Sequence, residues 1–146
     1  MADDKNFGLK KLMRNKKLII PVDVLVKNGN KTHITTPDDV SITDIIVDIG
    51  PKSVALVEGL IKESKTVLWN GPMGNYEKGF GKATEDILKI LAKTKTESIV
   101  GGGDTVALVS KLKLENKLSF VSTGGGATLE YLTKGTLPGI EALKKS

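Results

Sequence analysis

Cysteine is absent from this chain of 146 residues, which excludes disulfides, thiolate metal sites, iron–sulfur clusters and cysteine nucleophiles. Histidine occurs once, as His33 beside a predicted turn, so neither a Ser–His–Asp system nor a multi-histidine metal site is expected. No apolar run approaches the roughly 20 residues that span a bilayer. The opening residues also contain no apolar segment typical of a secretory signal. We therefore expect no membrane partner.

Arginine and aromatic side chains are also scarce. The formal net charge is +5, but Arg14 is the only arginine among 22 basic residues. Base readout favours the planar guanidinium group of arginine, and single-strand binding needs aromatic stacking surfaces. Only one tryptophan, two tyrosines and three phenylalanines are present. We expect no nucleic-acid partner, and we interpret the basic stretch at 10–17 as a solvated helix end.

Apolar segments that alternate with helical patterns make up most of the chain, whose length fits one domain over residues 1–146. Asn28-Gly29-Asn30 is a predicted turn, and residues 30–41 are a predicted loop. The alternation indicates an α/β fold with a parallel sheet covered by helices on both faces. Strands are expected at 18–26, 45–49, 66–70, 98–100 and 118–122, and helices up to about residue 15, at 51–64, at 80–93, after each later glycine-rich turn and near residue 138.

Three glycine-rich segments, at 70–74, 101–105 and 123–127, each follow a predicted strand and precede a predicted helix. In an open parallel sheet, ligands bind beyond the carboxyl ends of the strands. Glycines there let the backbone approach a ligand, and helix N-termini present N–H groups to an anion. We therefore expect a phosphate held by backbone amides. Neither the P-loop pattern nor Gly-x-Gly-x-x-Gly occurs, so the loops are not of a standard nucleotide-binding type.

Several polar side chains near these segments allow more than one interpretation. Asp104 could share a Mg²⁺ ion with a phosphate, or it could be the N-cap of the following helix. Glu77 could accept hydrogen bonds from ribose hydroxyls, or it could simply be solvated. Trp69 is expected in the core with its N–H bonded locally. Asp23 and Asp48, at strand ends, are expected to be structural hydrogen-bond acceptors.

The order and spacing of these segments resemble those of phosphoglycerate kinases. The resemblance covers about residue 7 to residue 146 and implies the later part of the C-terminal lobe of a kinase with two Rossmann-like lobes. The chain would then be a single partial domain, with the N-terminal lobe that binds the phosphoglycerate absent from it. The residues that carry the resemblance are Ile20-Pro21-Val22-Asp23, Asp48-Ile49-Gly50-Pro51, Trp69-Asn70-Gly71-Pro72-Met73-Gly74 with Tyr76-Glu77, Gly101-Gly102-Gly103-Asp104-Thr105, Ser122-Thr123-Gly124-Gly125-Gly126-Ala127 with Leu129-Glu130, and Leu137-Pro138-Gly139.

The resemblance implies a glycolytic, cytoplasmic enzyme that transfers a phosphoryl group reversibly between 1,3-bisphosphoglycerate and Mg-ADP, giving 3-phosphoglycerate and ATP. Its cofactor would be Mg²⁺, with ADP and ATP as substrates and Asp104 as the metal ligand. The site residues follow the family pattern. Asn70 and Pro72 would line the nucleotide pocket, Glu77 would hold the ribose, Gly102, Gly103, Asp104 and Thr105 would contact phosphates, and Gly103, Gly124, Gly125 and Gly126 would serve the transferring phosphoryl group.

The chain also departs from the family pattern. It lacks the nucleotide-lobe lysine in its Gly-x-Lys setting and the arginines of the acceptor site. Ala83-Thr84 stands where Gly-Thr is more usual, and Asn75 replaces an apolar residue. We therefore expect the isolated chain to be inactive. The alternatives are a non-catalytic nucleotide- or phosphate-binding module and a truncated structural fragment.

Overall fold

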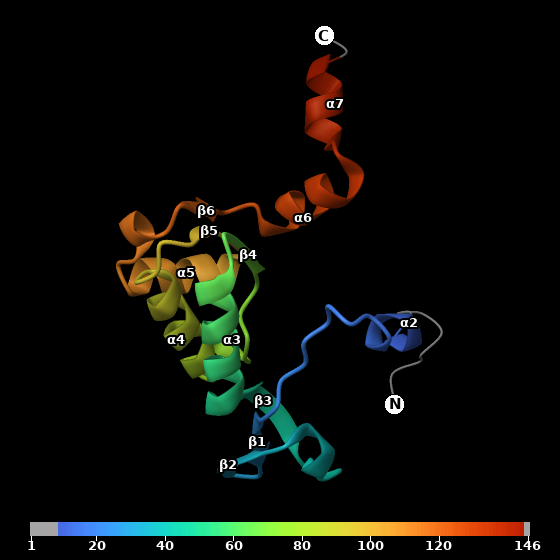
Figure 1. The fold of residues 1–146 in the computed structure, drawn as a ribbon, viewed down its shortest axis with the longest axis vertical. Coiled ribbons are helices and arrows are strands. Elements are labelled where there is room, and N and C mark those ends of the chain that lie inside the picture. Colours follow the sequence, from blue (N-terminus) through green and yellow to red (C-terminus); the bar gives the residue numbers. More distant parts are fainter. Residues whose placement is uncertain (1–8, 145–146) are drawn as a thin grey trace.

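The computed structural model describes residues 9–144 and contains two three-stranded sheets connected and flanked by helices (Figure 1). Within these residues, no helix is both long and apolar enough to cross a membrane. Residues 1–8, part of the predicted basic helix, and residues 145–146 lie outside the described range. The elements are α2 (Leu9–Met13), β1 (Val24–Asn28), β2 (Lys31–Thr35), η1 (Pro37–Asp39), β3 (Ile45–Ile49), α3 (Pro51–Glu63), β4 (Thr66–Asn70), η2 (Tyr76–Lys78), α4 (Lys82–Leu91), β5 (Glu97–Gly101), α5 (Gly103–Lys111), η3 (Glu115–Lys117), β6 (Phe120–Ser122), α6 (Gly125–Lys134) and α7 (Pro138–Lys144).

The second sheet is parallel, in the order β4-β5-β6, and confirms the α/β class. Each of its strands is followed by a helix, as the alternation of apolar segments and helical patterns predicts. Trp69 and Val100 are neighbours across β4 and β5 and face the core, with 6% and 0% of their surfaces exposed. α3, α4 and α5 cover this face, with apolar side chains spaced along one side of each helix. The buried core consists of Ile61, Trp69, Ile87, Leu88, Leu91, Val100, Leu108, Val109 and Leu118.

The first sheet is antiparallel, in the order β2-β1-β3, and differs from the expected arrangement. Asn28–Lys31 forms the predicted turn, but residues 31–35 form strand β2 rather than a loop. The loop prediction was wrong because hairpin pairing with β1 satisfies the backbone of a polar segment that stays largely solvent-exposed. The strand expected at 18–26 begins only at Val24, since residues 18–22 have no strand partner within the described chain.

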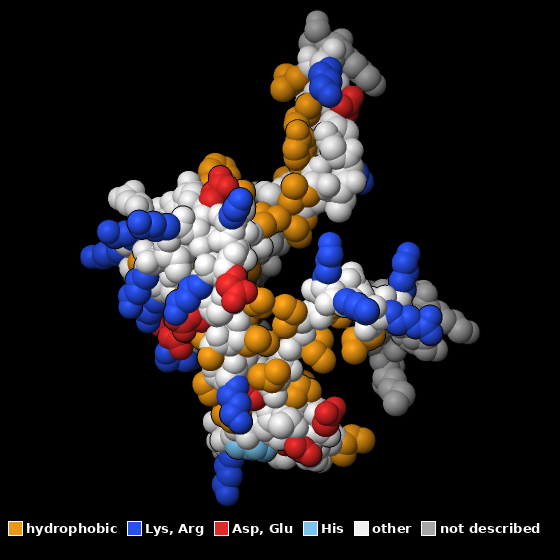
Figure 2. Space-filling model, viewed as in Figure 1, with side chains coloured by type: hydrophobic (Ala, Val, Ile, Leu, Met, Phe, Trp, Pro, Cys, Tyr) orange, Lys and Arg blue, Asp and Glu red, His pale blue; other side chains and the backbone are white. Residues whose placement is uncertain are grey.

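The other face of the parallel sheet carries apolar side chains that remain open to solvent. Leu68 of β4 is 44% exposed and Phe120 of β6 is 59% exposed. α6 and α7 extend away from the sheet rather than across this face (Figure 1). Figure 2 shows hydrophobic side chains on the side of the molecule between the N-terminal segment and the α6–α7 arm. The hydrophobic core therefore lies on only one face of this sheet.

Candidate functional site

The three predicted glycine segments meet at the carboxyl edge of the parallel sheet. Asn70 pairs in register with Gly101, and Gly101 pairs with Ser122, so the three strands end in one row. The N–H of Gly71 donates to the carbonyl of Gly101 at 3.1 Å, which joins the first two loops just beyond the strands. The prediction that these segments share one edge is confirmed. This edge is where open α/β sheets bind ligands.

The loops are packed so closely that glycine is required where they touch. A Cβ at Gly125 would overlap Asn70 Oδ1 and would lie 2.5 Å from the backbone nitrogen of Gly102. A Cβ at Gly101 would lie 2.9 Å from Asn70 Oδ1. Gly102 also has a φ of +95°, a conformation that side chains disfavour. The Asn70 side chain thus lies against both Gly101, at the end of β5, and Gly125, at the start of α6.

Two helices begin at this edge with glycine caps. Gly102 is the N-cap of α5 and Gly124 is the N-cap of α6, and neither helix start has a side-chain cap. The N–H groups of the first turn have no acceptor inside their own helix, so both starts can donate to an anion. Asp104 is exposed in the first turn of α5 and is not its N-cap. The N-cap interpretation of Asp104 is therefore wrong, and its carboxylate is open to solvent.

Two buried polar atoms behind this edge have no partner within the described residues. Thr105 is fully buried, and its hydroxyl makes no hydrogen bond. Trp69 is buried as expected, but its indole N–H is also unpaired, so the prediction of a local acceptor was wrong. Because the Thr105 side chain is covered, this residue can offer a ligand at the edge only its backbone N–H.

The loop from Gly71 to Gly81 is fixed by hydrogen bonds at two points. The N–H of Met73 donates to Thr84 Oγ1 at 2.9 Å, and the N–H of Asn75 donates to the carbonyl of Val47 at 2.8 Å. Thr84 is fully buried at the start of α4 and was not among the predicted site residues. In the sequence, Thr84 is a polar residue next to the apolar positions of α4, and this placement could have indicated that its side chain supports the loop at Met73. The loop that carries Pro72 and Glu77 is therefore anchored to helix α4 and to strand β3 of the first sheet.

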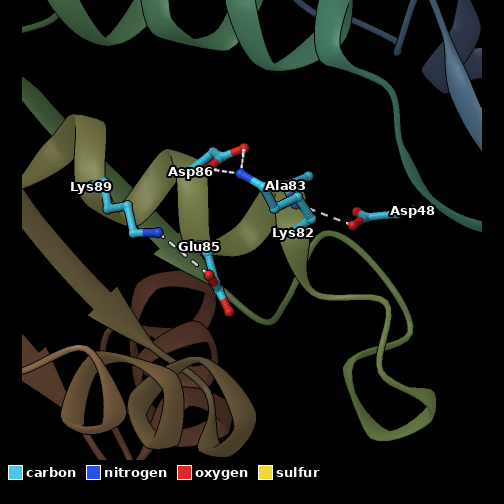
Figure 3. A network of polar contacts seen from close by, with 6 residues as sticks. All are labelled: Asp48, Lys82, Ala83, Glu85, Asp86 and Lys89. Carbon is cyan, nitrogen blue, oxygen red and sulfur yellow. Dashed lines mark hydrogen bonds and ion pairs between the residues drawn. The ribbon is translucent and has the colours of Figure 1, made fainter.

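Asp48 supports the same loop from the end of β3. It is 2% exposed, and its carboxylate accepts a hydrogen bond from the N–H of Ala83 at 3.1 Å (Figure 3). The N–H of the neighbouring Ile49 donates to the same carboxylate at 2.9 Å. A Cβ at Gly74 would overlap this carboxylate. Burial raises the pKa of Asp48, an effect that the hydrogen bonds from Ala83 and Ile49 only partly offset and that the nearby charge of Asp86 reinforces. Asp48 is thus a structural acceptor, as expected, and contacts the loop after β4.

Glu77 lies in η2, apart from the contacts that join the glycine loops. Its side chain is exposed and makes no hydrogen bond or ion pair with any other described residue. Asn75 fixes η2, since its side-chain oxygen accepts from the N–H of Lys78 at 3.3 Å. Glu77 is therefore available to a ligand, since no hydrogen bond or ion pair with residues 9–144 fixes the direction of its side chain.

An apolar cleft of about 430 Å³ lies beside the same loop. It runs between the first sheet and the loop after β4, so it is continuous with the residues that follow Pro72. Such a surface suits a flat, largely apolar group. The lining residues are Ile20, Pro21, Val24, Pro37, Ile46, Val47, Asp48, Ile49, Met73, Gly74 and Asn75.

A metal at this site would need ligands from outside the protein. Between residues 9 and 144 there is no group of three or more histidine, aspartate or glutamate side chains that could hold an ion. Mg²⁺, however, often takes only one or two carboxylates and completes its shell with phosphate oxygens and water. The single exposed carboxylate of Asp104, beside two helix N-termini, fits that pattern.

The fold and the edge define a class: an α/β protein whose parallel strands end in glycine loops and helix N-termini suited to a phosphate. Comparison with known proteins identifies the family. The family model for phosphoglycerate kinase matches residues 3–135. The phosphoglycerate kinase of Levilactobacillus brevis is 47% identical over 132 residues, which are 87% of this chain and 33% of that protein. This chain belongs to the phosphoglycerate kinase family.

Solved structures agree with this assignment. The phosphoglycerate kinase of Coxiella burnetii matches 97% of this chain with a TM-score of 0.79 and 37% identity, and the match covers 38% of the other chain. The phosphoglycerate kinase of Pyrococcus horikoshii OT3 matches 97% of this chain with a TM-score of 0.77 and 25% identity, and the match covers 34% of the other chain. The chain spans about a third of the length of the curated relatives it matches. It therefore corresponds to part of the fold of those enzymes.

Proposed function

We propose that this chain is the nucleotide-binding part of a phosphoglycerate kinase, later in the C-terminal lobe, and that it binds Mg-ADP and Mg-ATP at the carboxyl edge of β4-β5-β6. One observation carries this proposal. Helices α5 and α6 both begin with glycine, have no side-chain cap, and start side by side where the parallel strands end. The reaction would be reversible phosphoryl transfer between 1,3-bisphosphoglycerate and ADP, in the cytoplasm. The name shared by its relatives supports this reaction.

The phosphates would be held by backbone amides. Gly102, Gly103, Asp104 and Thr105 supply the start of α5, where Thr105 contributes through its N–H because its side chain is buried. Gly124, Gly125 and Gly126 supply the start of α6, near the transferring group. Phosphoryl transfer depends on positioning and on donors aimed at the developing charge, and backbone amides fixed by close packing provide both.

The metal and the nucleoside would bind on either side of these phosphates. Asp104 would hold Mg²⁺ together with phosphate oxygens, and the ion would neutralise charge on the transferring group. The base would lie along the apolar cleft beside Met73 and Asn75. Asn70 and Pro72, which precede these residues in the chain, would line the rest of the nucleotide pocket. Glu77, which is exposed and has no partner among the residues that the structure describes, would accept hydrogen bonds from the ribose hydroxyls.

The phosphoglycerate would bind elsewhere, on an N-terminal lobe that this chain does not contain. With Arg14 as its only arginine, the chain lacks the bidentate cations that suit an anionic acceptor. We accordingly expect the isolated chain to bind Mg-ADP without catalysing transfer. The alternative, a module that binds nucleotide and never catalyses, is favoured by the same scarcity of arginine.

Isothermal titration of the chain with Mg-ADP tests this proposal. We expect saturable binding that weakens about tenfold or more in Asp104→Ala, because one carboxylate–metal contact is lost. Glu115→Ala is the matched control, since Glu115 is also an exposed acidic residue at the start of a short helix but lies away from the edge. Equal affinity in wild type and Asp104→Ala would refute the metal assignment, and no binding by a folded chain would refute the nucleotide site.

Joining this chain to the rest of a relative separates the two functional alternatives. A chimera that replaces the matched third of the Levilactobacillus brevis enzyme with this chain should convert 1,3-bisphosphoglycerate and ADP to 3-phosphoglycerate and ATP. An inactive chimera that still binds Mg-ADP would support the non-catalytic module instead.

A further inference from the structure

The apolar cleft beside the loop after β4 contains one accessible polar side chain, that of Asn75. Among the residues that line the cleft, only Asp48 and Asn75 carry polar side chains. Asp48 is 2% exposed, and its carboxylate already accepts from the N–H groups of Ala83 and Ile49. Asn75 is exposed. A ligand in the cleft therefore meets a single side chain, Asn75, that can form a new hydrogen bond with it.

The backbone of Asn75 is fixed by hydrogen bonds at both of its polar groups. Its N–H donates to the carbonyl of Val47 at 2.8 Å. Its carbonyl accepts from the N–H groups of Lys78 and Phe80, each at 3.1 Å. These bonds join Asn75 to strand β3 and to the short helix η2. Because both backbone groups are engaged, only the side chain of Asn75 remains to interact with a ligand.

The N–H of Lys78 determines which way the Asn75 side-chain amide is turned. This N–H lies 3.3 Å from the side-chain oxygen, which caps η2. A backbone N–H can only donate, so the atom that faces it is the oxygen and not the nitrogen of the amide. The Asn75 NH₂ group makes no hydrogen bond with any residue between 9 and 144. Asn75 therefore offers a ligand in the cleft hydrogen-bond donors.

Purine bases differ in how well they match a group that only donates. Guanine presents two acceptors, N7 and O6, on one edge, whereas adenine presents the N7 acceptor beside an amino donor. Hypoxanthine has the same carbonyl at C6 as guanine. An asparagine recognises adenine by using its oxygen and its nitrogen together. Because the oxygen of Asn75 is engaged by Lys78, its remaining donors suit a base with a carbonyl at C6.

We propose that Asn75 determines base selectivity at this site and that its NH₂ group donates to the C6 carbonyl of a 6-oxopurine nucleotide such as GDP or IDP. Placing the base in this cleft rests on the proposed function. The selectivity deepens that function, since it adds 6-oxopurine nucleotides to the adenine nucleotides as ligands of the same site. The apolar wall that includes Val47 and Met73 contacts either ring system, so only the hydrogen bond from Asn75 distinguishes the two bases.

Isothermal titration of the chain and its variants with Mg-ADP and Mg-IDP tests this selectivity. We expect the ratio of the ADP dissociation constant to the IDP dissociation constant to fall about fivefold in Asn75→Val, which loses the donor. Asn75→Asp should lower the ratio too, because its carboxylate keeps the cap on Lys78 but replaces the donor by an acceptor. The added charge weakens both nucleotides alike and cancels in the ratio. Asn116→Asp, on an exposed asparagine of η3, is the matched control and should leave the ratio unchanged.

Two results would overturn the role of Asn75 and leave the nucleotide site intact. One is a ratio that stays the same in both Asn75 variants. The other is equal weakening of both nucleotides in Asn75→Val, which would mean that Asn75 acts only by shaping the loop. Thermal unfolding checks each variant, and if Asn75→Val does not fold, Asn75→Asp, which retains the cap, decides the question.

Mg-pyrophosphate, which has no base, separates this selectivity from the proposed function. A chain that binds Mg-pyrophosphate with the same affinity as both nucleotides would refute the base cleft, and with it the role of Asn75, while the phosphate edge would stand. A folded chain that binds none of the three ligands would refute the proposed function as well. Binding of both nucleotides with the expected change of ratio in the Asn75 variants would support both proposals.

Discussion

Ser53 and Asp23 join the start of α3 to the end of a segment thirty residues earlier. The hydroxyl and the N–H of Ser53 both donate to Asp23 Oδ1, each at 2.7 Å, and the N–H of Lys52 donates to Oδ2 at 3.0 Å. α3 begins after Gly50, which has no side chain to cap the helix. Asp23 therefore supplies from a distant part of the chain the acceptors that an N-cap residue would supply locally.

Asp23→Asn should destabilise the chain by about 2–3 kcal/mol at neutral pH, because the amide leaves a buried helix-start donor without its charged acceptor. Burial acts to raise the pKa of Asp23, but the hydrogen bonds from Ser53 and the N–H of Lys52, with the Lys52 charge, lower it below its ordinary 3.8. The stabilisation is thus present above pH 3.8 and is lost as the pH falls through the folded-state pKa. Urea unfolding at several pH values measures this loss. Asp38→Asn, on an exposed carboxylate, should have little effect at any pH.

Asp48→Asn should show the opposite dependence on pH. Burial raises the pKa of Asp48 above 3.8, so ionisation costs more in the folded chain than in the unfolded chain. The wild type should therefore gain stability relative to Asp48→Asn as the pH falls from neutral toward 3.8 and below. The same urea series checks this, and a difference that stays constant or moves in the other direction would contradict the account of Asp48.

Gly125→Ala and Gly126→Ala should change stability in opposite directions. A methyl group at Gly125 overlaps Asn70 and the backbone of Gly102, so unfolding free energy should fall by about 1–3 kcal/mol. A methyl group at Gly126 meets nothing within 4 Å, and the helical backbone tolerates it, so stability should rise by about 0.4–1 kcal/mol. Thermal and urea unfolding distinguish the two. Equal effects would mean that the loops after β5 and β6 are not in close contact.

Thr105→Val should stabilise the chain by about 1 kcal/mol, since it replaces an unpaired buried hydroxyl by a methyl group of the same shape. Affinity for Mg-ADP should be unchanged, because the backbone N–H remains. Thr105→Ser, which keeps the hydroxyl and removes the methyl group, is the control and should be less stable than wild type. Weaker nucleotide binding in Thr105→Val would show instead that the side chain turns outward to meet the ligand.

The position of the candidate site could be predicted from the sequence because it follows from strand ends alone. Parallel strands in register place their carboxyl ends together, so the segments after Asn70, Gly101 and Ser122 had to meet once the strands were recognised. How closely the loops after these strands approach one another could not be predicted. It depends on Gly125 and Gly102 approaching around the Asn70 side chain, which is a property of the packed sheet.

Features that depend on distant partners were not visible in the sequence. β2 is a strand because β1 pairs with it, although its residues are polar and mostly exposed. Thr84 supports the loop at Met73 through a hydrogen bond across eleven positions. Asp23 and Asp48 were expected to be hydrogen-bond acceptors, but the helix starts from which they accept lie about thirty residues later, and that pairing could not be predicted. Periodicity and local turn patterns report neighbours along the chain, so these contacts lie beyond their reach.

The most direct test is a titration of the ¹⁵N-labelled chain with Mg-ADP, followed by amide chemical shifts. If the carboxyl edge of β4-β5-β6 holds the phosphates, the largest shifts will fall on Gly102, Gly103 and Gly124–Gly126, and Asp104→Ala will reduce them. No shift in a folded chain, or the largest shifts on β1, β2 and α7, would contradict the central claim that two glycine-started helices form the phosphate site.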